Sequence, residues 1–162
     1  MGQRLCCLVE TYPAHHDSLD DFQKTLRAAY LYAKTVTLVS SHDRETNAVM
    51  LRNRRIGCSM TGIVQAIHRH GYRRFLRRCD TSYQFVQALD QEMSARFAVL
   101  RSIKTTSVKP SGTVSILAGA TPGVHWDHAP YYVTAGARRR RPSPGELVSR
   151  SRLPGRGGRL LR

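Results

Sequence analysis

The sequence has no run of 18 or more apolar residues, so no segment of it predicts a transmembrane helix. Met1 to Glu10 also lacks the long apolar stretch of a secretory signal. Cysteine is scarce, and the four present (Cys6, Cys7, Cys58 and Cys79) are too widely spaced for a disulfide framework. The Cys6–Cys7 pair has no second Cys/His pair at zinc spacing, so no metal site is predicted. We therefore expect a reducing, cytoplasmic setting.

Acidic residues are also few, with 11 against 26 lysines and arginines, which gives a net charge of +15. About half of that charge lies in residues 138–162, where nine arginines face the single acid Glu146. A basic chain suggests nucleic acid as a partner. The same segment has no aromatic residue on which bases could stack. Non-specific nucleic-acid binding through the basic C-terminal tail therefore stays as the alternative function.

Residues 134–162 contain no aromatic residue, few β-branched residues and many Arg, Gly, Pro and Ser. Such a segment cannot bury enough apolar surface to offset the entropy of ordering it, so disorder is expected. The same composition is typical of GC-rich coding sequence read in a shifted frame. The predicted division is thus a folded region, residues 1–133, followed by a disordered and frameshift-like tail, residues 134–162.

The first 133 residues alternate between strand and helix patterns. Apolar residues at helical spacing predict a helix from Leu19 to Lys34, with Ser18 as its capping residue. Leu5 to Glu10 reads as a buried strand, and because it starts almost at once, we expect further sequence upstream. Thr35 to Val39 is either a strand or the continuation of the helix.

The rest of this region continues the alternation and predicts an α/β layout with crossover helices. A capping-box pattern at Thr81 to Gln84 predicts the start of a long amphipathic helix. The remaining predictions are helices over 45–52, 63–69 and 82–100 and buried strands over 56–62 and 103–108.

A polar loop follows the last strand. Lys109-Pro110 ends the strand because proline has no N–H for a ladder. Small hydroxylated residues surround a glycine and lead into an apolar run, which predicts strand, tight loop and helix start. Free N–H groups at such a junction suit a phosphate, but an ordinary capped turn explains the pattern equally well. The candidate anion-binding residues are Ser111, Gly112, Thr113, Val114 and Ser115.

Five stretches together resemble the catalytic subunits of ribonucleotide reductases, most closely the monomeric, adenosylcobalamin-dependent (class II) ribonucleoside-triphosphate reductases. The likeness covers roughly residues 5–133, and the combination is far more specific than any one stretch. The stretches are Cys6 to Thr11, Ala29 to Thr37, Val49 to Gly57, Ile103 to Ser115 and Thr121 to Trp126.

The resemblance implies a fold, a substrate site and an activity. The fold would be part of a ten-stranded α/β barrel, and residues 111–115 would bind the phosphates of a ribonucleoside triphosphate. The family reduces the 2′ carbon of the ribonucleotide by a thiyl-radical mechanism that adenosylcobalamin initiates. A thioredoxin-type dithiol supplies the electrons, and deoxynucleoside triphosphates act as effectors.

The resemblance also implies that Cys6 is one of two reducing cysteines, whereas two buried structural thiols would be the ordinary reading of Cys6 and Cys7. The family's radical cysteine lies in an Asn-Pro-Cys-x-Glu motif, expected about ten residues before Cys6. This chain does not contain that motif. We therefore expect an enzyme fragment that is inactive alone.

Overall fold

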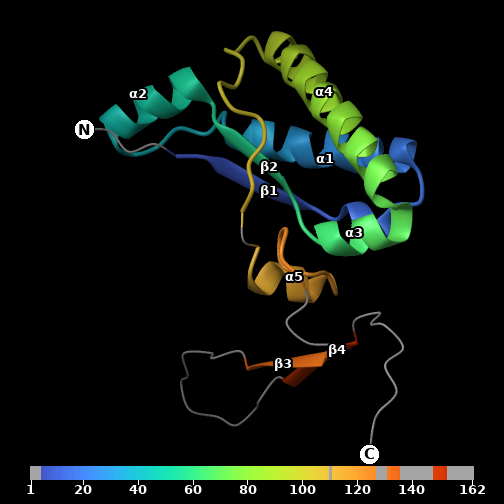
Figure 1. The fold of residues 1–162 in the computed structure, drawn as a ribbon. Coiled ribbons are helices and arrows are strands. Elements are labelled where there is room, and N and C mark those ends of the chain that lie inside the picture. The colour runs from blue at the N-terminus through green and yellow to red at the C-terminus, as the bar shows by residue number, and fades with distance from the viewer. Residues whose placement is uncertain (1–4, 110, 127–130, 136–147, 153–162) are drawn as a thin grey trace, which may run out of the picture.

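The computed structural model describes residues 5–109, 111–126, 131–135 and 148–152. Strands and helices alternate through most of this range (Figure 1). In chain order the elements are β1 (Cys7–Thr11), the 3-10 turn η1 (Pro13–His15), α1 (Leu19–Val36), α2 (Arg44–Asn53), β2 (Ile56–Met60), α3 (Ile63–His70), α4 (Tyr72–Arg96), α5 (Thr113–Leu117), β3 (Tyr131–Ala135) and β4 (Val148–Arg152). Within the described residues, no helix is both long and apolar enough to cross a membrane.

Strand β2 has a parallel neighbour on each edge. On one edge β1 pairs with it in register, from Cys7 opposite Ile56 to Thr11 opposite Met60. On the other edge an extended segment, residues 103–108, runs alongside it, and Cys58 forms a parallel bridge to Thr106. Parallel strands joined by helices confirm the α/β class. The described strands form only pairs, so the ten-stranded barrel stays a prediction.

Helices α1 and α4 pack together on one face of this sheet (Figure 1). The apolar stripe predicted for α1 is the one that is buried. Its members meet the inner face of α4 and the helix-facing side of β2, which makes one hydrophobic core. The core consists of Phe22, Leu26, Tyr30, Ala33, Ile56, Cys58, Val86, Leu89 and Met93.

Most helix predictions are confirmed, with one correction. The Ser18 hydroxyl caps α1 by accepting a hydrogen bond from the Asp21 amide at 3.1 Å, and the helix continues to Val36. The long helix begins at Tyr72, ten residues before the predicted start. Burial of Phe75 against α3 outweighs the capping pattern, so the whole pattern, residues 81–84, lies inside the helix.

Two of the three strands predicted to be buried, residues 5–10 and 103–108, are half-exposed instead, whereas β2 is buried. Leu8 in β1 is 51% exposed and Val108 is 76% exposed. Helices cover only one face of the sheet, so alternate side chains on these segments meet solvent. Residues 103–108 also form a bridge with β2 and no regular strand.

Part of the predicted tail has regular structure. β3 and β4 pair antiparallel, with Tyr131 opposite Arg152 and Ala135 opposite Val148. Residues 134, 135 and 148–152 thus take part in a main-chain ladder, and the disorder of the tail as a whole stays a prediction. The other tail residues, 136–147 and 153–162, lie outside the described residues. The division at residue 133 stays a prediction.

A charged pair lies in the middle of the core. The Lys34 ammonium lies 2.8 Å from Asp90 Oδ1, and both side chains are almost fully buried. Lys34 also donates to the hydroxyls of Ser94 and Ser102, while Tyr30 donates to Asp90. Burial alone would raise the pKa of Asp90, but the hydrogen bonds from Lys34, Ser102 and Tyr30 outweigh burial and lower it. The pair joins α1 to α4.

Replacing Asp90 by asparagine should destabilise the fold by about 3–5 kcal/mol, because a buried ammonium loses its counter-charge. Urea unfolding measures this change in the free energy of unfolding. Asp80→Asn on the exposed side of α4 is the matched control and should change it by less than about 0.5 kcal/mol.

Because the folded-state pKa of Asp90 is lowered, the pair stabilises the fold at pH values above the pKa that Asp90 has in the unfolded chain. The stability difference between the parent and Asp90→Asn should shrink as the pH falls below about 4. An Asp90→Asn variant as stable as the parent at neutral pH would contradict this account.

Candidate functional site

The candidate phosphate loop lies at the carboxyl ends of β1 and β2. Main-chain bonds hold its far side in place: Gly62 donates to the Thr121 carbonyl at 2.9 Å, and Ile63 donates to the Gly123 carbonyl at 3.4 Å. The Gln65 side chain on α3 makes two more bonds, to Gly119 and Thr121. Figure 1 shows α5 below the sheet, beside α3. Ligands of open α/β sheets commonly bind at this end of the strands.

The two described serine hydroxyls of the loop are turned inward. Ser111 Oγ accepts a hydrogen bond from the Gly123 amide at 2.9 Å, and Ser115 Oγ donates to the Gly112 carbonyl at 2.6 Å. Ser111 is 8% exposed and Ser115 is fully buried. These serines therefore brace the loop, and their hydroxyls do not face solvent as phosphate donors.

The backbone of the loop is tightly turned. Ser111 and Gly112 have φ angles of 35° and 47°, in the left-handed region that favours glycine. The Val114 amide donates to the Ser111 carbonyl and the Ser115 amide to the Gly112 carbonyl. Gly112 and Val114 remain exposed, whereas the side chain of Thr113 lies outside the described residues.

A second ion pair joins the loop to the sheet. Glu10, near the end of β1, has a side chain that is only 5% exposed, and its Oε2 lies 2.9 Å from the ammonium of Lys109, which is 25% exposed. Thr61, just after β2, donates a hydrogen bond to the other carboxylate oxygen. Sequence reasoning missed this pair. Glu10 is the one acid within its strand, but its partner lies 99 positions away and no local pattern connects the two.

The hydroxyl of Tyr12 also reaches the loop, where it donates to the Val114 carbonyl at 3.4 Å. Partial burial raises the pKa of Tyr12, the nearby Glu10 carboxylate raises it further, and Lys109 opposes both. The Tyr12 hydroxyl, Glu10 and Lys109 therefore act on one another electrostatically beside the loop. All three are placed there by the end of β1 and by the start of the loop.

Cys6 lies at the opposite end of the same sheet face. Residues 6, 8 and 10 alternate with the helix-facing residues, so Cys6, Leu8 and Glu10 share the open face. Cys6 is exposed. A Cβ added at Gly57 would lie 2.5 Å from Leu8 Cδ2, so Leu8 would have to shift, and 3.4 Å from the Cys6 sulfur, which is ordinary contact. At strand spacing, about 13 Å separates Cys6 from Glu10.

The Cys6 thiol has two basic neighbours. Partial burial raises its pKa, while the charges of Lys104 and Arg55 act in the opposite direction. Cys58 differs sharply, because deep burial raises its pKa to about 12. A thiolate is the reactive form, so Cys58 is inert and Cys6 is the accessible thiol.

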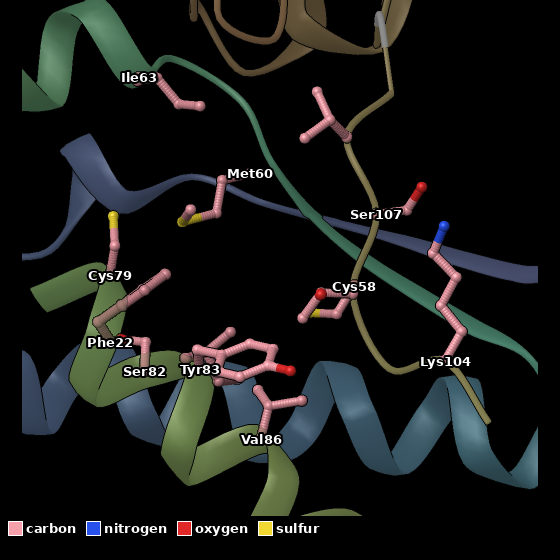
Figure 2. A pocket seen from close by; sticks show the side chains of 13 residues that line it. Phe22, Cys58, Met60, Ile63, Cys79, Ser82, Tyr83, Val86, Lys104 and Ser107 are labelled. Atoms are coloured by element: carbon pink, nitrogen blue, oxygen red, sulfur yellow. The ribbon is translucent and has the colours of Figure 1, made fainter. Parts of the chain in front are cut away.

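A pocket of about 460 Å³ lies on the closed face of the sheet. Figure 2 shows Lys104 and Ser107 at one end, Phe22 and Cys79 at the other, and Cys58 between them. Its size suits an ordinary small molecule and is too small for a corrinoid cofactor. The described residues also contain no group of three or more His, Cys, Asp and Glu that could hold a metal ion. This pocket therefore does not fit adenosylcobalamin.

Comparison with known proteins adds to this geometry. No family model matches the chain. The chain is 55% identical over 129 residues to a probable adenosylcobalamin-dependent ribonucleoside-triphosphate reductase of Dictyostelium discoideum, with 80% of this chain and 17% of that protein covered. It is 51% identical over 143 residues to the adenosylcobalamin-dependent ribonucleoside-triphosphate reductase of Euglena gracilis, with 88% of this chain and 20% of that protein covered.

A solved structure agrees with the sequence relatives. The crystal structure of a B-12-dependent (class II) ribonucleotide reductase superposes with a TM-score of 0.71 at 30% identity, over 79% of this chain and 22% of that one. The fold is thus that of one segment of a class II ribonucleotide reductase. More narrowly, the curated relatives are adenosylcobalamin-dependent ribonucleoside-triphosphate reductases, which confirms the resemblance seen in the sequence. The chain spans about a fifth of their length.

The four cysteines should react with iodoacetamide at very different rates. We expect Cys6 to be alkylated first and Cys58 last, because Cys6 is exposed and Cys58 is buried. Lys104→Met should slow alkylation of Cys6 at pH 8 by about two- to fivefold, since loss of the positive charge raises the thiol pKa.

Peptide mass spectrometry at timed intervals measures each rate. Lys24→Met, on the exposed face of α1, is the matched control and should leave the rate at Cys6 unchanged. A rate at Cys58 that equals the rate at Cys6 would contradict the placement of these thiols.

Proposed function

We propose that this chain supplies a substrate-phosphate loop and a reducing cysteine to an adenosylcobalamin-dependent ribonucleoside-triphosphate reductase. The enzyme would reduce ribonucleoside triphosphates to 2′-deoxyribonucleoside triphosphates by thiyl-radical chemistry. One observation carries this proposal: more than half of the matched residues are identical to curated reductases of two distant organisms. The nucleic-acid alternative has no comparable support.

In this proposal the phosphates of the substrate lie against residues 111–115. The location at the carboxyl ends of two parallel strands supports the proposal, as does the tight backbone turn at Ser111 and Gly112. The N–H of the exposed Gly112 would meet the anion, with Thr113 as a further contact, while the Val114 N–H is already bonded to the Ser111 carbonyl. Ser111 and Ser115 would act by holding the loop in shape.

Cys6 would be one of the two thiols that deliver electrons. Reduction at the 2′ carbon replaces the hydroxyl by hydrogen and releases water, while two thiols lose two hydrogens and form a disulfide. A thioredoxin-type dithiol would then reduce that disulfide by thiol exchange. The exposure of Cys6 on the open face of the sheet supports this role. Its partner would lie outside this chain, because Cys58 is buried and Cys79 lies on the closed face.

The remaining parts of the reaction would come from regions of the relatives that this chain does not span. Adenosylcobalamin, which generates the radical when bound, is assigned to those regions because the pocket found here does not fit it. Deoxynucleoside triphosphate effectors and a cytoplasmic location are proposals of the same kind.

The 162-residue chain alone should produce no deoxynucleotide from a ribonucleoside triphosphate, adenosylcobalamin and a dithiol. It lacks the Asn-Pro-Cys-x-Glu motif that the resemblance assigns to the radical cysteine. Chromatography of the reaction mixture measures the product. Any deoxynucleotide above background would contradict the proposal that the radical chemistry requires regions of the relatives that this chain does not span.

A chimera tests the contribution of this chain directly. Residues 5–133 would replace the matched segment of the Euglena gracilis enzyme, which shares 51% identity with this chain. We expect a chimera that turns over with a dithiol reductant, and Cys6→Ser should lower its multiple turnover by at least a hundredfold because one electron-delivering thiol is lost.

Cys7→Ser is the matched control, since Cys7 is the next residue and alternation turns it toward the opposite face. It should retain most of the turnover. Equal losses for Cys6→Ser and Cys7→Ser would show that the substitutions damage the strand, and full activity of Cys6→Ser would remove the assigned role.

A further inference from the structure

The Glu10–Lys109 pair lies at the point where the loop leaves the sheet. Lys109 is two residues before Ser111, and its ammonium lies 2.9 Å from the Glu10 carboxylate. Thr61 donates to the same carboxylate, and Tyr12 reaches across to the Val114 carbonyl. Four residues from three segments thus meet at the first turn of the loop.

The two members of the pair differ in exposure. The Glu10 side chain is 5% exposed, whereas that of Lys109 is 25% exposed. A buried carboxylate needs its partner, because an unpaired charge in the protein interior is very costly. Glu10 therefore holds the lysine in one orientation. The contact with Glu10 is an ion pair, and Glu10 Oε2 accepts no hydrogen bond. A lysine ammonium has three N–H donors, which remain for a second anion.

Because the two serines point into the loop, binding of phosphate there depends more on the Lys109 cation. Ser115 donates its hydroxyl within the loop, and Ser111 is almost fully buried with its oxygen accepting from the Gly123 amide. A triphosphate carries several negative charges and needs a cation close by, and Lys109 adjoins the loop directly. Charge-assisted hydrogen bonds of this kind are about twice as strong as neutral ones.

We propose that Lys109 contacts the substrate's phosphates and that Glu10 is the positioning residue that aims its ammonium. This inference rests on the proposed function of the loop. It adds two residues to those that the resemblance assigns and gives the loop a positive charge of its own. The ammonium would bridge the buried carboxylate and a phosphate oxygen.

Titration of the ¹⁵N-labelled 162-residue chain with inorganic tripolyphosphate tests the proposal, with the Gly112 amide resonance as the readout. We expect a saturable shift in the parent chain. Lys109→Met should weaken binding about tenfold or more, as the loss of a hydrogen bond to a charged group predicts. Lys109→Arg should restore binding to within about threefold.

Two further variants distinguish a Glu10 that orients Lys109 toward phosphate from a Glu10 that only stabilises the loop. Glu10→Gln keeps an oxygen acceptor that can still position Lys109 and removes the negative charge that repels phosphate, so tripolyphosphate should bind at least as tightly as in the parent. Lys24→Met removes an equal charge from the exposed face of α1 and should change the affinity by less than about twofold.

Each outcome decides a different point. No Gly112 shift in the parent chain would overturn the phosphate role of the loop itself. A Gly112 shift whose affinity Lys109→Met leaves unchanged would overturn the present inference and leave the loop's role standing. Equal weakening by Lys109→Met and Glu10→Gln would show a structural brace and would also overturn it. Should Lys109→Met fail to fold, Glu10→Gln decides alone, because weaker binding by that variant contradicts the proposal.

Discussion

A buried lysine–aspartate pair determines where the extended segment beside β2, residues 103–108, begins. Asp90 on α4 accepts hydrogen bonds from Lys34 on α1 and from the backbone amide of Ser102. That amide lies immediately before residues 103–108, which then follow the free edge of β2. The segment ends at Lys109, where the candidate phosphate loop starts. The position of the loop therefore depends on a charge interaction inside the hydrophobic core.

The sheet has a closed face and an open face, and the proposed functional side chains Cys6 and Glu10 lie on the open face. The closed face packs against α1 and α4 and contains the inert thiol of Cys58. The open face carries Cys6 at one end and Glu10 at the other. Gly57 keeps this face shallow, since any side chain there would collide with Leu8. The proposed reducing thiol and the proposed phosphate loop would together suit a ligand that lies along the strand.

The sequence allowed good predictions where a pattern is local. The stripe of α1, its Ser18 cap and the loop after residue 108 all follow from spacing and turn chemistry, and each is found in the structure. The start of α4 was predicted wrongly because tertiary burial of Phe75 outweighs a local capping pattern. The half-exposed strands were also missed, because periodicity does not reveal which face of a sheet is covered.

The site was predictable only in part. Cys6 came from the resemblance, and residues 111–115 came from the loop pattern and the resemblance together. The inward direction of Ser111 and Ser115 could not be inferred from residue type. The pairs Lys34–Asp90 and Glu10–Lys109 join residues 56 or more positions apart, so no window of sequence reveals them. Both pairs involve buried carboxylates, whose partners become apparent only when the chain is folded.

Disulfide mapping tests the central claim most directly. The chimera that carries residues 5–133 in the Euglena gracilis enzyme would be given adenosylcobalamin and a ribonucleoside triphosphate without any dithiol, then alkylated and digested. Cys6 is predicted to appear in a disulfide with a cysteine of the surrounding enzyme, in an amount equal to the deoxynucleotide formed. Deoxynucleotide formed while Cys6 remains a free, alkylated thiol would contradict the account.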